Sequence, residues 1–158
     1  MKIRQEKPSD YNEVYELVKI SFATNSDDDR TTSDYLNEIR KKDTFIPELS
    51  LVAEGDSGKI IGQIVLCEMR INTKNEEIVE LLLSPICVHP EYFRKGIARI
   101  MIEKVFDIAR IMGYKAVFLC GNPELYKKFR FKPSCEYNVF HITDELKNAE
   151  WCMAYELV

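Results

Sequence analysis

The sequence predicts one α/β (α+β) domain spanning residues 1–158, built on a mixed β-sheet. Three strand-like segments at 48–54, 60–71 and 77–88 are separated only by the turns GDSGK and TKNE, which favours an antiparallel meander. The third segment is followed by a helical segment and another strand-like run at 114–120, and a strand–helix–strand unit of this kind pairs its two strands in parallel. A chain of 158 residues is long enough to bury one core without disulfides or metals.

The composition is that of an ordinary soluble globular protein, with 46% hydrophobic and 30% charged residues. The formal net charge of −4 argues against a dedicated nucleic-acid-binding protein, which would carry a basic surplus. No apolar run approaches the ~20 residues of a membrane span, and the N-terminal MKIRQEKPSD lacks the apolar core of a signal peptide. We therefore expect a cytoplasmic protein that binds neither nucleic acid nor membranes.

The cysteines and histidines do not form a metal-binding pattern. No two cysteines have the Cys-x-x-Cys spacing, and the two histidines, His89 and His141, are far apart in the sequence. We therefore expect no metal. We expect buried, reduced thiols at the five cysteines, which are Cys67, Cys87, Cys120, Cys135 and Cys152.

The N-terminal part is predicted to form a short strand at 2–5 and two amphipathic helices. Ser9 is the expected cap of the first helix. Its apolar residues recur at helical spacing and are Tyr11, Val14, Tyr15, Val18 and Phe22. The acidic stretch NSDDDRTTSD is expected to be a loop before a second helix around 35–41. This charge run is either a solvated surface or a lip for a cationic substrate.

The helix between the two parallel strands is predicted from its apolar stripe and from Gly113, a plausible left-handed stop. The stripe consists of Ile97, Met101, Val105, Ile108 and Met112. The next strand, YKAVFLC, is almost wholly apolar, as expected of a strand that is covered on both faces. NPELYKKF then predicts a short helix that starts at Pro123. The segments FKPSCEYNVF and EWCMAYEL are the expected closing strands.

The turn before that helix has the features of an anion site. A helix N-terminus presents unpaired N–H groups and a partial positive charge. Gly96 leaves the backbone open to a ligand, and Arg94, Lys95 and Arg99 add positive charge. By itself the turn could equally be a solvent-exposed basic corner, because it has neither the P-loop pattern nor the glycine pattern of dinucleotide-binding folds.

The segment PICVHPEYFRKGIARIMIEKVFDIARIMGYKAVFLCGNPELYKKFRFKP resembles the central motif of the GNAT superfamily of acyl-CoA-dependent N-acetyltransferases, as found in small single-domain bacterial members. In that family a Q/R-x-x-G-x-G/A loop and the following helix hold the diphosphate of acyl-CoA. Phe93 departs from the usual Gln or Arg, whereas Gly96 and Ala98 fit. GNPELYKKFRFKP resembles the GDPEYYxRFGF segment of one bacterial branch, with Arg130 in place of its glycine. The likeness extends over nearly the whole chain.

This resemblance implies a three-layer fold. Its central sheet would be mixed and mostly antiparallel, with about seven strands, a splayed parallel pair and about four flanking helices. Acetyl-CoA would be the co-substrate, with its pantetheine arm in the gap between strands 77–88 and 114–120. The cofactor-binding residues that the resemblance implies are Ile86, Cys87, Val88, Phe93, Arg94, Lys95, Gly96, Ile97, Ala98, Arg99, Asn122 and Tyr126.

The resemblance also implies that Tyr126 protonates the departing CoA thiolate, although the residue pattern alone favours packing on a helix face. Glu80 and Glu68 are the candidates for accepting the proton of the amine, unless they lie on a solvated strand face. His89 is expected to be structural or adjacent to phosphate. We expect neither Cys87 nor Cys120 to act as a nucleophile, because the sequence suggests no His partner for either.

The expected activity is acetyl transfer from acetyl-CoA to a primary amine of a small molecule or peptide, by direct attack in a ternary complex. One alternative is an acyl-CoA-binding sensor or regulatory module without turnover. Another is a structural or protein-interaction domain with no affinity for CoA. The chain is expected to be a monomer or a homodimer.

Overall fold

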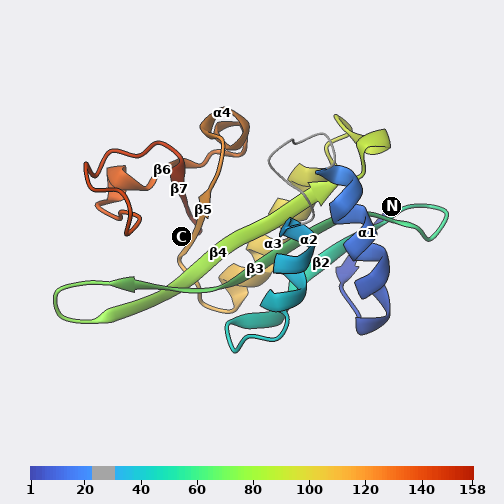
Figure 1. The fold of residues 1–158 in the computed structure, drawn as a ribbon, viewed down its shortest axis with the longest axis horizontal. Helices are drawn as coiled ribbons and strands as arrows, with labels where there is room; N and C mark the ends of the chain where they lie inside the picture. The colour runs from blue at the N-terminus through green and yellow to red at the C-terminus, as the bar shows by residue number, and fades with distance from the viewer. Residues whose placement is uncertain (23–30) are drawn as a thin grey trace.

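The computed structural model describes residues 1–22 and 31–158, and in that part of the chain seven strands form one sheet with the order β1-β2-β3-β4-β5-β7-β6 (Figure 1). The strands are β1 (Lys2–Gln5), β2 (Phe45–Glu54), β3 (Ile60–Asn72), β4 (Glu77–Val88), β5 (Ala116–Cys120), β6 (Lys132–Pro133) and β7 (Cys152–Glu156). The α-helices are α1 (Tyr11–Ser21), α2 (Thr31–Ile39), α3 (Ile97–Ile111) and α4 (Pro123–Tyr126). Of the neighbouring strands, β4 and β5 run parallel and the others antiparallel. The predicted mixed sheet with a parallel pair is confirmed.

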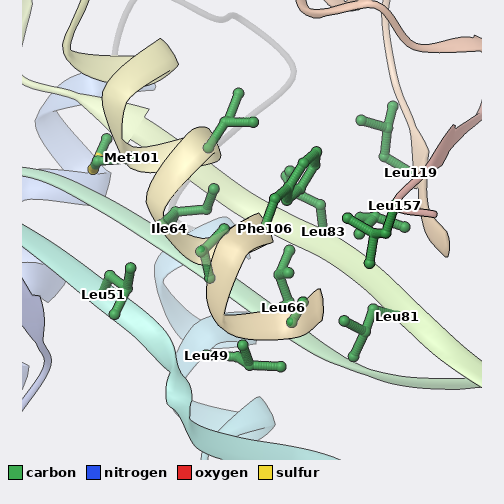
Figure 2. Close-up of a cluster of buried hydrophobic side chains, with 14 of the residues drawn as sticks. Leu49, Leu51, Ile64, Leu66, Leu81, Leu83, Met101, Phe106, Leu119 and Leu157 are labelled. Carbon is green, nitrogen blue, oxygen red and sulfur yellow. The ribbon is translucent and has the colours of Figure 1, made fainter. Parts of the chain in front are cut away.

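Helices cover both faces of the sheet, which makes three layers. In Figure 1, α1 and α2 lie in front of the sheet and α3 lies behind it. Figure 2 shows Met101 and Phe106 of α3 among leucine and isoleucine side chains of β2, β3 and β4. The core on the opposite face consists of Val14, Leu17, Val18 and Leu36 from the helices, with Val52, Ile60, Val65 and Cys87 from the strands. Burial of these two apolar sets holds the layers together.

The N-terminal helix does not begin with the predicted cap. Ser9 lies inside a short 3-10 turn, Pro8–Asp10, that precedes α1. The Asp10 carboxylate accepts from the backbone N–H of Lys7 at 2.7 Å across this turn, and it makes no side-chain bond to the first amides of α1. Arg4 holds this carboxylate with two hydrogen bonds of 2.8 and 3.0 Å. A closed turn, joined to β1 through Arg4, therefore precedes α1 in place of a side-chain cap.

Other boundaries differ from the prediction for local reasons. Gly113 ends α3 with a φ of +94°, as predicted, but Met112 lies beyond the last helical residue and is 43% exposed, so it is not part of the core stripe. The helix predicted around 35–41 is α2.

The predicted closing strand at 131–140 is mostly turn, because Pro133 has no N–H for a ladder and a 3-10 turn follows it. The part of the acidic stretch before Thr31 lies outside the described residues.

Two general expectations concern membranes and metals. In residues 1–22 and 31–158 no helix combines the length and the apolar character needed to cross a membrane. The same residues contain no cluster of three or more His, Cys, Asp or Glu side chains placed to hold a metal ion.

Candidate active site

The parallel strands β4 and β5 separate soon after they meet. They pair only at Leu81–Val117 and Leu82–Phe118, although β4 continues to Val88 and β5 to Cys120. Beyond Leu82 the edge of β4 that faces β5 therefore has no partner strand. A cleft of about 730 Å³ opens at this point, lined by β4, the end of β5, α4, the N-terminus of α3 and the end of α1. Unpaired backbone beside a cleft is a natural place for an extended ligand to bind as an added strand.

The register of β3 and β4 shows which backbone groups face this cleft. The N–H of His89 donates to Ile61 at 2.8 Å, which makes Gly62–Val88 a non-hydrogen-bonded pair of the antiparallel ladder. Val88 and, two residues earlier, Ile86 consequently direct their N–H and C=O groups away from β3 and toward the unpaired edge. Cys87, between them, directs its own groups to β3.

β4 contains a β-bulge at Ser84 and Pro85. Leu66 pairs with Leu83 and Ile64 pairs with Ile86, so that Ser84 and Pro85 together oppose one residue of β3. Such a bulge bends a strand and interrupts its ladder, and it tolerates a proline, which has no N–H to donate. The bulge lies in the cleft lining and contributes to the separation of β4 from β5.

The basic turn before α3 forms one end of the cleft. Gly96 is the N-cap of α3 with a φ of +79°, and Arg94 also has a positive φ, of +63°. Backbone of this kind is costly for a residue with a Cβ, so its presence at Arg94 marks a constrained loop. Arg94, Gly96 and Arg99 line the cleft, as does Phe93, whose surface is 53% exposed. The first amides of α3 have no intrahelical acceptor and face the same space.

Most of the residues expected to bind the cofactor are brought together here. Ile86, Cys87, Val88, Phe93, Arg94, Gly96, Ile97, Ala98, Arg99 and Tyr126 all line the cleft. Lys95 and Asn122 are not among the lining residues. The ammonium of Lys95 lies 5.1 Å from the centre of the Tyr92 ring. The Asn122 side chain accepts from the N–H of Glu124 at 3.0 Å and thereby caps α4. The geometry gives both residues local structural contacts instead.

Tyr126 lies at the side of the cleft on α4. Its ring packs against Phe129 and Phe131, with centroid distances of 6.5 and 6.0 Å. The ring also lies directly over Gly121, since a Cβ placed on that glycine would be 2.7 Å from Cε2 of Tyr126. Burial raises the pKa of the Tyr126 hydroxyl above its ordinary value. The phenol therefore remains protonated at neutral pH and can act as a donor.

The two glutamates do not lie in the cleft lining. Glu80 precedes the last paired residues of β4, and its carboxylate accepts from the backbone N–H groups of Lys115 (3.0 Å) and Ala116 (3.1 Å). It therefore joins the start of β5 to β4. Glu68 accepts a hydrogen bond from the hydroxyl of Tyr114. Burial and this bond raise the pKa of Tyr114 to about 12. The geometry gives both carboxylates structural partners and favours neither as a base.

His89 has the structural position that was expected. Its Nδ1 accepts from the N–H of Glu91 at 3.2 Å, and its ring contacts the edge of Tyr92. The cysteines are less uniform than expected. Cys67, Cys87 and Cys152 are buried, but Cys120 is exposed and lines the cleft.

Several lining residues carried no readable signal in the sequence. Lys128 adds a cation beside Arg99, whose guanidinium donates to the Lys128 carbonyl at 3.2 Å. The lining also includes Ser21, Phe22, Thr32 and Ser84. The Ser21 hydroxyl lies 3.1 Å from the carbonyl oxygen of Val88. None of the described residues that line the cleft is Asp or Glu. Ser21, Phe22, Thr32 and Ser84 join the lining only because α1, α2 and β4 meet in space.

The family model described as "Acetyltransferase (GNAT) domain" matches residues 2–134. The chain belongs to this GNAT acetyltransferase family. An Escherichia coli K12 relative, "Uncharacterized N-acetyltransferase YhbS", is 27% identical over 139 residues, which cover 88% of this chain and 78% of the relative. This relative shares the family's name, and its own description leaves its acceptor open.

Solved structures of this GNAT family share the fold. The crystal structure of E. coli YhbS in complex with CoA has a TM-score of 0.83 and 24% identity, covering 99% of this chain and 81% of that one. A GNAT acetyltransferase from Brucella melitensis in complex with acetyl-CoA has a TM-score of 0.77 and 22% identity, covering 98% and 86%. At these identities the likeness establishes the three-layer fold.

Proposed function

We propose that this GNAT family member transfers an acetyl group from acetyl-CoA to a primary amine of a small molecule or peptide, by direct attack in a ternary complex. The observation that carries the proposal is the separation of β4 from β5, which leaves an unpaired backbone edge between a basic helix N-terminus and a protonated tyrosine. The CoA and acetyl-CoA bound in the E. coli and B. melitensis structures support the choice of donor.

The donor would lie along the unpaired edge of β4. The pantetheine amides find N–H and C=O groups at Ile86 and Val88, in the manner of a strand added to a sheet. The diphosphate finds the free amides of α3, with Arg94 and Arg99 as counter-charges. Phe93 offers an apolar surface at the same end. Asn122 and Lys95 have no direct part in this arrangement.

Acetyl transfer has four requirements: a site that holds both reactants, stabilisation of the thioester oxygen, a proton for the thiolate and an acceptor for the proton of the amine. The cleft holds the amine and the thioester together, which removes much of the entropic cost of their meeting. A backbone N–H of β4 stabilises the negative charge that develops on the thioester oxygen during attack. When the C–S bond breaks, the hydroxyl of Tyr126 gives its proton to the CoA thiolate. Because the described lining contains no carboxylate, we assign the proton of the amine to water and not to Glu80.

The first experiment is a screen of primary amines with acetyl-CoA, using thiol release as the signal. The panel contains polyamines, amino acids, aminoglycosides and peptides with free N-termini. A control without acceptor corrects for the five cysteines of the protein. If CoA binds in calorimetry but no amine of this panel releases thiol, the result contradicts acetyl transfer to these acceptors and favours the acyl-CoA-binding module.

The second experiment replaces Tyr126 with Phe, which keeps the ring and its packing and removes only the donor. We expect kcat to fall roughly 10²-fold, at the low end for general acid catalysis, while CoA affinity and thermal stability stay near those of the parent. Tyr137→Phe is a matched control, because Tyr137 lies in the 3-10 turn after β6 and outside the cleft lining. An unchanged kcat in Tyr126→Phe would refute the acid role.

A further inference from the structure

Two cysteines face each other across neighbouring strands at the edge of the cleft. Cys120 of β5 is the register partner of Cys152 of β7 in an antiparallel pair. The N–H of Gly121 donates to the carbonyl of Trp151 at 2.9 Å, which places the two cysteines at a non-hydrogen-bonded position. Side chains at such a position point to the same face and come closest together. Both thiols are free in the structure.

The two thiols differ in access. Cys120 is exposed and belongs to the cleft lining, next to the glycine over which the Tyr126 ring lies. Cys152 is only 7% exposed, and it lies behind Cys120 as seen from the cleft. A reagent in the cleft can therefore reach the sulfur of Cys120, whereas Cys152 is within reach of Cys120 itself. This is the arrangement of an attacking thiol with a resolving thiol behind it.

The surroundings favour an ionised sulfur within the pair. A hydrogen bond from the Cys120 thiol lowers the pKa of Cys152; burial opposes this shift, and Ser134 and His141 add to it. Donating this bond raises the pKa of Cys120. At the other cysteine of the cleft, Cys87, burial is the largest influence and raises the pKa to about 12. Thiolates attack disulfides and thiols do not, so Cys120 becomes the attacking sulfur when its proton passes to the Cys152 thiolate.

We propose that Cys120 and Cys152 form a dithiol site that reacts with small-molecule disulfides, and with CoA disulfide in particular. The preference for CoA disulfide rests on the proposed function, because the cleft that binds the CoA moiety brings its sulfur–sulfur bond to Cys120. The site is separate from the acetyl-transfer chemistry, in which neither cysteine takes part.

The reaction runs in two exchanges. The proton of Cys120 passes across the hydrogen bond to Cys152, and the Cys120 thiolate attacks one sulfur of CoA disulfide. The S–S bond of the reagent breaks, a Cys120–CoA mixed disulfide forms, and the first CoA leaves as a thiolate, which takes the proton from Cys152. The Cys152 thiolate then attacks the Cys120 sulfur, closing a Cys120–Cys152 disulfide and releasing the second CoA thiolate. Two protein thiols are oxidised and one disulfide is reduced to two CoA thiols.

The second exchange has a consequence for the cleft. In the mixed disulfide a whole CoA moiety is attached to the lining, and acetyl-CoA cannot enter. Closing the bond to Cys152 expels this moiety and draws the Cys120 sulfur toward β7. The buried cysteine thus clears the cleft, and a thiol reductant returns the pair to its starting state.

The test exposes the reduced full-length protein to CoA disulfide and follows its intact mass without reductant. We expect the parent to lose two hydrogens, with a peptide map that links Cys120 to Cys152. Cys152→Ser should accumulate one CoA adduct on Cys120, and Cys120→Ser should gain neither the adduct nor the link. Cys135→Ser is the matched control, because Cys135 lies outside the cleft lining, and it should behave like the parent. Cys152→Ala serves as the trapping variant if the serine variant does not fold.

Glutathione disulfide supplies the same S–S bond without the nucleotide, and we expect it to react with Cys152→Ser at least tenfold more slowly. Absence of a CoA adduct on Cys120 in the trapping variant would overturn the dithiol site. A calorimetric CoA titration of the parent separates the two proposals. CoA binding without an adduct overturns the dithiol site alone, whereas absence of CoA binding together with equal rates for both disulfides overturns the CoA preference and the proposed function with it.

Discussion

Gly121 offers a sharp test of how the position of Tyr126 is maintained. A Cβ at residue 121 would lie 2.7 Å from Cε2 and 3.3 Å from Cδ2 of the Tyr126 ring. Ordinary carbon–carbon contacts begin at about 3.5 Å, so Gly121→Ala should push the ring away by about 0.8 Å. The ring cannot retreat freely, because Phe129 and Phe131 pack against it. The displacement must therefore move the phenol within the cleft or strain this aromatic cluster.

Both consequences can be measured. Overpacking of this kind costs about 1–3 kcal/mol of stability, which a urea unfolding curve resolves. A misplacement of about 1 Å in a catalytic constellation can cost up to about 10²-fold in rate. For Gly121→Ala we expect kcat in acetyl transfer to fall by about tenfold or more, with CoA affinity changed by less than about threefold, since the phosphate end of the cleft is untouched (tenfold is ~1.4 kcal/mol).

Gly55→Ala is the matched control for this substitution. A Cβ at Gly55 would meet the nearest atoms of Ile61 and Lys59 at 3.5 Å, an ordinary contact, and Gly55 lies outside the cleft lining. The control should leave both kcat and stability near the parent values. If folded Gly121→Ala retained the full kcat of the parent, Tyr126 would not need its observed position, and the acid role would lose its geometric basis.

Three further predictions concern the rest of the site and the fold. Gly96→Val should raise the KM for acetyl-CoA at least tenfold (~1.4 kcal/mol), because the φ of +79° is strained for a β-branched residue and the turn must shift; an unchanged CoA titration of the folded variant would remove the phosphate-cradle assignment. Phe93→Gln should change CoA affinity by less than about tenfold if backbone amides dominate the cradle, and loss of affinity in both Phe93→Ala and Phe93→Gln would instead identify Phe93 as an apolar wall for the nucleotide. Asp10→Asn should cost about 1.5–3 kcal/mol at pH 7. Arg4 lowers the pKa of Asp10 in the folded state. The parent therefore has this extra stability above the unfolded-state pKa of about 4 and loses it as the pH falls through the lower folded-state value. The free energy of unfolding of the variant, measured in urea, should consequently depend less on pH below about 4, and an equal pH dependence of the two proteins would show that the ion pair contributes nothing.

Glu80 shows which property of the site the local sequence does not encode. The residue was rightly placed on β4, but the cleft begins only beyond Leu82, where pairing with β5 ends. Glu80 precedes this point. Its carboxylate accepts from the backbone N–H groups of Lys115 and Ala116 at the start of β5. The position at which two parallel strands separate depends on contacts made across the whole sheet, and no local pattern encodes it.

The sequence by itself determined most of the elements and the basic turn. Hydrophobic periodicity predicts α3 and the strands because it depends on neighbours a few residues apart, and Gly96 and Gly113 stand where the backbone needs a positive φ. Only the tertiary structure decided which side chains meet. The facing of Cys120 and Cys152, and the position of the Tyr126 ring over Gly121, follow from strand register and packing. Register is a long-range property, because it is set by the simultaneous burial of several faces and not by any one segment.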